Sequence, residues 1–123
     1  MALKKELVGS GIWGGSADAI NGSVVTGITA YAGGGQTNAV VLSGAVNVIG
    51  TCATAADSVK LPVASAGDEV WVRNNGAASS NVFPQSGGKI NNGTGDAAVA
   101  CAASKTMVFK CIGGVDWVAC LTA

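Results

Sequence analysis

The fold of this chain is decided by the stretch Asp-Ser-Val-Lys-Leu-Pro-Val-Ala-Ser-Ala-Gly-Asp-Glu-Val-Trp-Val-Arg-Asn-Asn-Gly (residues 57–76) and the run Asn-Val-Phe-Pro-Gln-Ser-Gly-Gly-Lys-Ile-Asn-Asn-Gly (residues 81–93). Both consist of short runs of β-branched and aromatic residues between Gly, Asn, Asp and Pro, which is typical of strands joined by turns. In the first stretch, Val70 and Val72 alternate with Trp71 and Arg73. This period of two predicts a strand with one face in the core and the other toward solvent or a neighbouring molecule.

The turns in these stretches predict antiparallel hairpins. Pro62 has no backbone N–H to donate and therefore closes its strand. Residues 66–68 and 74–76 supply Gly, Asn and Asp, which tolerate positive φ or cap a turn, and Gly113-Gly114 suits a further hairpin. Short strands are predicted at residues 46–52, 58–61, 69–74, 81–83, 97–102, 106–111 and 117–121, with shorter apolar runs between residues 24 and 45. Strands at this spacing, without a long helical period, predict an all-β fold, a small antiparallel sandwich or barrel.

The composition points to a surface that partners cover. The chain has 123 residues, enough for one domain with a real core. Charged residues are only 11% of the chain, against roughly a quarter in ordinary soluble domains. Seven basic and seven acidic residues give a formal net charge of zero, so little electrostatic repulsion opposes association. Nucleic acid is not the expected partner, because the basic residues are scattered apart from Lys4-Lys5.

Residues 1–23 are predicted to form an N-terminal arm, and residues 24–123 the β-domain. Several glycines surround apolar residues in the arm and argue against a stable helix there. Apolar side chains on such an arm need a surface to bury against, either their own domain or another molecule. The candidate binding residues of the arm are Leu3, Lys4, Leu7, Ile12 and Trp13, and the candidate subunit-interface residues of the domain are Trp71, Phe83 and Trp117.

No catalytic group is evident, and we expect neither enzymatic activity nor a cofactor. The chain has no histidine, and its few carboxylates show no pairing that suits acid–base catalysis. Calcium bound by Asp57, Asp68 or Asp96 is an alternative to ordinary turn carboxylates, but the spacing of a known calcium loop is missing. The triple glycine at residues 33–35 predicts a loop, and no helix with a following lysine supports a phosphate site there.

The four cysteines leave three interpretations open. They contain no Cys-x-x-Cys pair, so a zinc site would need all four thiolates from distant strands. The alternatives are buried free thiols and at least one disulfide. The first residues lack the apolar run of a secretory signal, and no stretch approaches the roughly 20 apolar residues of a membrane helix. We therefore expect synthesis in a cytosol and no membrane partner.

Several motifs together resemble a module of tailed bacteriophages. They are Asp57-Ser58-Val59-Lys60-Leu61-Pro62, Ala66-Gly67-Asp68-Glu69-Val70, Val82-Phe83-Pro84, Gly87-Gly88-Lys89-Ile90-Asn91, Phe109-Lys110-Cys111 and Asp116-Trp117. The pattern is similar to small β-rich virion proteins, which include head decoration proteins and segments of head or tail fibres. It spans roughly residues 46–121 and consists of strand and turn residues, without a catalytic signature.

This resemblance implies a homotrimeric protein made in the host cytoplasm and attached to the outer surface of the capsid. There it would bind the major capsid protein and stabilise the contacts between capsomers. A fibre or baseplate module is the alternative, and a carbohydrate-binding domain using Tyr31 or Trp71 is another. The short chain favours decoration, because no long repetitive shaft is present.

Overall fold

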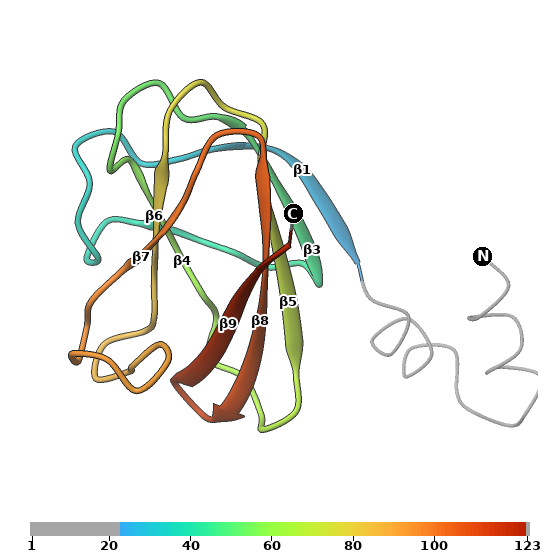
Figure 1. Cartoon of the computed structure of the whole chain (residues 1–123), viewed down its shortest axis with the longest axis vertical. Coiled ribbons are helices and arrows are strands. Elements are labelled where there is room, and N and C mark those ends of the chain that lie inside the picture. The colour runs from blue at the N-terminus through green and yellow to red at the C-terminus, as the bar shows by residue number, and fades with distance from the viewer. Residues whose placement is uncertain (1–22, 123) are drawn as a thin grey trace, which may run out of the picture.

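The computed structural model describes residues 23–122, and within that range the chain forms nine strands and no helix (Figure 1). A five-stranded sheet has the order β1-β3-β5-β8-β9, and a four-stranded sheet has the order β2-β4-β6-β7. The strands are β1 (Val24–Thr29), β2 (Val40–Val41), β3 (Val46–Thr51), β4 (Ser58–Lys60), β5 (Glu69–Asn74), β6 (Ser80–Phe83), β7 (Val99–Cys101), β8 (Lys105–Gly113) and β9 (Asp116–Thr122). The fold is all-β, and neither sheet is closed into a barrel because each has two edge strands.

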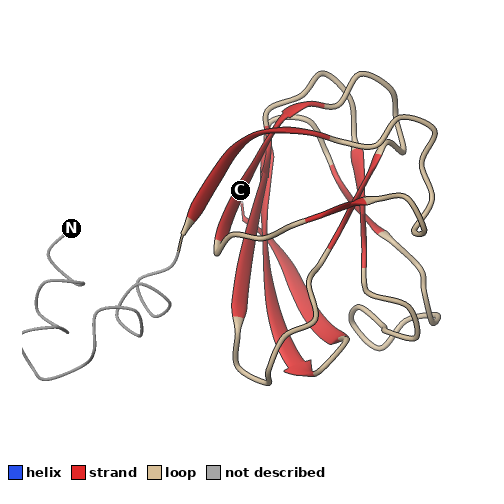
Figure 2. Ribbon diagram, turned by 180° about the vertical axis from the view of Figure 1, so that it is seen from behind, coloured by secondary structure: helices blue, strands red, loops and turns tan. Residues whose placement is uncertain are grey.

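The first six strands alternate between the two sheets and pair in parallel. In the five-stranded sheet β3 pairs in parallel with β1 and with β5, and in the four-stranded sheet β4 does so with β2 and with β6. Only the ladders of β7, β8 and β9 are antiparallel. The prediction of an antiparallel fold is therefore wrong for the first six strands, where the chain winds three times through both sheets (Figure 2).

Two predicted hairpins turn out to be crossings between sheets. The turn that includes residues 66–68 leads from β4 to β5, and the turn at residues 74–76 leads from β5 to β6. At the first, Asp68 accepts a hydrogen bond from the N–H of Ser65 (2.9 Å) and closes the turn. Such residues show that the chain bends, but they do not specify which strand it pairs with next. The β8–β9 hairpin at Gly113-Gly114 is confirmed.

The positions of the strands agree with the sequence patterns. The predicted range 69–74 coincides with β5, and the other predicted ranges overlap β3, β4, β6, β7, β8 and β9. Along β8, Met107 and Phe109 are buried whereas Lys110 is exposed. The triple glycine at residues 33–35 lies in a loop, and all three residues have positive φ. Local patterning thus placed the strands, although it did not place their partners.

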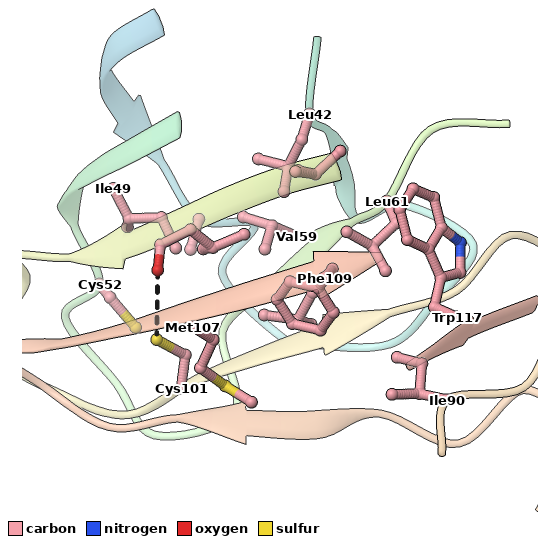
Figure 3. Close-up of a cluster of buried hydrophobic side chains, with 14 of the residues drawn as sticks. Leu42, Ile49, Cys52, Val59, Leu61, Ile90, Cys101, Met107, Phe109 and Trp117 are labelled. Atoms are coloured by element: carbon pink, nitrogen blue, oxygen red, sulfur yellow. Dashed lines mark hydrogen bonds between the residues drawn. The ribbon is translucent and has the colours of Figure 1, made fainter. Parts of the chain in front are cut away.

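The core lies between the two sheets and draws side chains from both (Figure 3). Trp117, Phe109 and Ile49 enter it from the five-stranded sheet, and Val59 and Val82 enter it from the four-stranded sheet. All five side chains are fully buried. Burying a side chain of this size contributes about 1.5–3 kcal/mol, so this cluster is the main stabilising feature of the body.

Two buried asparagines fix the paths between strands. Asn47 hydrogen bonds both backbone groups of Gly44 and also donates to the carbonyl of Trp71 (3.2 Å). Asn74, at the end of β5, donates from Nδ2 to the carbonyl of Cys101 on β7 (2.9 Å). Because buried polar groups are costly without partners, these amides favour one path of the chain over its alternatives.

Candidate interaction surface

The structure places the predicted interface residues in different surroundings. Trp71 is partly exposed on β5, whereas Phe83 is half-buried on β6. Trp117 is fully buried within its own chain, so its side chain belongs to the core and is not presented to a partner. The arm residues Leu3, Lys4, Leu7, Ile12 and Trp13 lie outside the described residues.

A row of apolar side chains crosses the outer face of the five-stranded sheet. In the ladder registers Val24 lies beside Val46, Val46 beside Trp71, Trp71 beside Val108, and Val108 beside Cys120. We call these five residues the apolar row. Val24 is 66% exposed and Trp71 is 38% exposed. One residue from each of the five strands contributes, so the row spans the sheet from edge to edge and forms a continuous apolar surface of the kind that marks interaction sites.

Charged residues lie on both sides of this row at β5. Glu69 lies two residues before Trp71, and its carboxylate accepts a hydrogen bond from the indole Nε1–H (2.9 Å). Arg73 lies two residues after Trp71 and donates from Nε to the Asn75 side chain (2.7 Å) and from Nη1 to the carbonyl of Ser104 (2.8 Å). These bonds hold the indole and the guanidinium in defined positions on the outer face. The row is therefore a preorganised surface flanked along β5 by Glu69 and Arg73, with Lys110 of β8 beside Glu69 in the register.

The two edges of the five-stranded sheet differ. Along β9, Asn91 covers the outer edge, because Asn91 Oδ1 accepts from the N–H of Ala119 (2.8 Å) and its own N–H donates to the carbonyl of Trp117 (2.8 Å). On β1, no strand of the described residues pairs with the outer edge. Gly27 there has a φ of 69° and the register shifts beside it. A covered edge and a bulge are both features that limit edge-to-edge pairing.

The four thiols are free in the structure, and three of them are buried. Burial raises the pKa of Cys101, and burial together with the Asp57 carboxylate raises the pKa of Cys52. These thiols pack as small apolar groups and are poor nucleophiles, since the thiolate is the reactive form. Cys120 differs, because it is exposed at the end of the apolar row on β9.

The acidic residues considered for calcium serve separate turns. Asp57 accepts from the N–H of Thr54 (3.2 Å), and Asp96 accepts from the N–H of Gly87 (2.7 Å) and from the amide of Gln36 (3.1 Å). The Gln36 and Gly87 donors lower the pKa of Asp96. Within residues 23–122, no group of three or more Cys, Asp or Glu side chains is arranged to hold a metal ion.

Sequence reasoning missed most of the apolar row. Alternation within one strand separates its two faces, but the row also requires knowing which residues lie side by side on five strands. Val24, Val46 and Cys120 belong to strands whose pairing and register the sequence did not specify. The sequence showed which residues of a strand share a face, but it did not show which strands are neighbours in the sheet.

In comparisons with protein-family models, curated proteins and solved structures, no significant match to this chain was found. Among the described residues there is also no helix with the length and hydropathy needed to cross a membrane. The geometry of the apolar row and the resemblance carried by the sequence motifs are therefore the features that bear on function.

Proposed function

We propose that this chain is a structural virion protein of the capsid decoration type, which binds the outer surface of a tailed-phage head and stabilises the contacts between capsomers. The observation that supports this proposal is the apolar row on a body of low charge. An exposed apolar surface that crosses a whole sheet is typical of a protein that functions in contact with other proteins.

The arm is the proposed attachment to the major capsid protein. Its apolar residues Leu3, Leu7, Ile12 and Trp13 would bury several hundred Å² per arm, which at about 25 cal/mol per Å² gives several kcal/mol before ordering costs. One arm would bind weakly. In the proposed homotrimer three linked arms bind together, and their effective concentration raises the overall affinity.

Co-sedimentation with undecorated heads tests this function. The full chain should pellet with the heads, whereas a truncation that starts at Val24 should remain in the supernatant. The described core residues lie between Ala30 and Trp117, so the truncation keeps them. Equal binding by the two proteins would show that the arm is not the anchor, and failure of both would refute decoration.

The same experiment separates decoration from its alternatives. A head-fibre, tail-fibre or baseplate module would bind other virion proteins and would not bind the shell of an empty head. A carbohydrate-binding module would use exposed aromatic side chains, and Tyr31 and Trp71 are each 38% exposed. Tyr31 forms a bridge with Ser58 of β4, whereas Trp71 belongs to the other sheet. The two aromatics therefore do not share a sheet face, which disfavours a common sugar platform.

A further inference from the structure

We propose that the outer face of the five-stranded sheet binds the same face of a second copy of this chain, about a two-fold axis that passes through Trp71 along the apolar row. This contact goes beyond the virion function proposed above and does not depend on it. Two observations support the proposed contact: the order of residues on β5 and the composition of the apolar row.

The outward residues of β5 are complementary to themselves. Glu69, Trp71 and Arg73 follow one another on the outer face, with a negative charge at one side of the indole and a positive charge at the other. A two-fold axis along the row makes the β5 strands of the two copies antiparallel. Glu69 of each copy then faces Arg73 of the other, and the pair is made twice. Opposite charges placed in this way favour one orientation of two faces over others.

The hydrogen bonds of both charged groups within residues 23–122 are made to neutral partners. Glu69 accepts from the Trp71 indole, and Arg73 donates to Asn75 and to the carbonyl of Ser104. These bonds orient the groups without neutralising their charges. Lys110 lies beside Glu69 in the register of β5 and β8, and under the same axis it faces the Thr106 position of the second copy. On β5 and β8 the axis places no like charges directly opposite each other, but Lys110 of one copy lies diagonally across from Arg73 of the other, which also donates to Thr106 of its own chain (3.5 Å).

Along the row, each residue faces its own counterpart. Valine lies on valine at Val24, Val46 and Val108, and the two Trp71 indoles meet near the centre. Stacked sheets lie about 10 Å apart with strand directions within about 30° of each other, so side chains from both faces fill the space between them. The arrangement buries apolar groups against apolar groups along the whole row.

The size of the face predicts a weak contact. Five strands about 4.8 Å apart and six residues of about 3.3 Å each give a flat face of about 500 Å² per copy. The pair would bury about 1,000 Å² in total, at or below the lower limit for stable complexes, which is about 1,200 Å². We therefore expect a dissociation constant in the micromolar to millimolar range. Between isolated chains, the contact forms pairs. Between trimers bound to a capsid, the same contact would join neighbouring trimers across a two-fold axis.

Charge reversal tests the axis. Sedimentation velocity of the full chain from about 10 μM to about 1 mM should show association that rises with concentration. Glu69→Arg and Arg73→Glu should each weaken it by about tenfold or more, because each creates two repulsive pairs. The double variant restores opposite charges across the axis and should restore association. Urea unfolding of each variant excludes loss of folding as the cause. Absence of association in the full chain, or a double variant no better than the singles, would overturn the proposal.

Cys120 gives an independent test, because it lies on the row and faces its own counterpart across the axis. A short bismaleimide should link two full chains through Cys120, each thiol adding to one maleimide double bond to form a thioether. Cys120→Ser should abolish the product, since Cys52, Cys101 and Cys111 are buried. Equal yields in the unaltered chain and in Glu69→Arg would refute the two-fold contact.

The test also separates the second copy from other occupants of the face. If residues 1–22 of the same chain cover it, Glu69→Arg will not change the association of the full chain but will weaken that of the truncation from Val24, and that result would overturn the proposal. Binding to heads is measured separately, so either proposal can fail while the other stands. The expected result is association of the full chain with the charge dependence described above.

Discussion

Replacing Asn74 by alanine should destabilise the body by about 2–4 kcal/mol, because this side chain satisfies three backbone groups. Its Nδ2 donates to the carbonyls of Ala78 (2.8 Å) and Cys101 (2.9 Å), and its Oδ1 accepts from the N–H of Gly76 (2.9 Å). Asn74 is fully buried at the point where the chain leaves one sheet for the other. The bond to Cys101 is buried, so water cannot readily replace that partner, whereas the bonds to Ala78 and Gly76 are only partly buried.

The magnitude follows from the number of groups left without a partner. Each buried donor or acceptor that loses its hydrogen bond costs about 1–3 kcal/mol. The buried carbonyl of Cys101 contributes the full cost, whereas the partly buried groups of Ala78 and Gly76 contribute less because water can reach them, so the total is about 2–4 kcal/mol. Since a domain of this size has a total stability of about 5–15 kcal/mol, the variant should fold but with a much smaller margin.

Urea unfolding followed by tryptophan fluorescence measures the effect, since Trp117 lies in the core. Asn75→Ala is the matched control, because Asn75 is exposed and its side chain accepts a hydrogen bond from Arg73 at the surface. We expect the control to lose less than about 1 kcal/mol. If Asn74→Ala loses no more than Asn75→Ala, the idea that the buried amide joins the two sheets is refuted.

Three further predictions follow from thiol burial, a turn carboxylate and a close backbone approach. A thiol reagent at neutral pH should label Cys120 in the folded chain and all four cysteines only after unfolding, and Cys120→Ser should abolish the native signal. The Gln36 and Gly87 donors lower the pKa of Asp96 in the folded chain below the pKa of about 3.9 that it has in the unfolded chain. The Asp96 carboxylate therefore stabilises the fold fully above about pH 3.9, and this contribution is lost as the pH falls through the lowered pKa of the folded chain. The difference in urea midpoint between the unaltered chain and Asp96→Asn should therefore be largest at neutral pH and vanish in acid, and a constant difference would contradict it. Gly88→Ala should cost about 3 kcal/mol in the same assay, since its Cβ would overlap the carbonyl oxygen of Val115, whereas Gly95→Ala, with open space around it, should be nearly neutral.

The sequence predicted the elements of this fold better than their arrangement. The run Val70 to Arg73 shows its alternation locally, and the structure buries Val70 and Val72 and turns Trp71 and Arg73 outward, so the predicted two-sided strand is confirmed. Parallel pairing could not be predicted in this way, because β3 and β5 are joined through a strand in the other sheet. The same limit applies to the interaction surface. Trp71 was identified as an exposed aromatic, but its neighbours Val46 and Val108 come from strands that are distant in sequence.

The motifs that carry the phage resemblance lie mainly in the framework of the body. Asp57 and Asp68 accept hydrogen bonds in turns, and Leu61, Phe109 and Trp117 are fully buried. These residues specify turns and core packing, so the resemblance bears more on the shape of the body than on what it binds. Along the same strands, outward residues alternate with inward ones and are not constrained by the core. Two chains could therefore share this framework and contact different partners through their outer faces. For this reason the identity of the partner has to be tested by changing Glu69, Trp71 and Arg73 on the outer face, because changes in the core would alter folding and binding together.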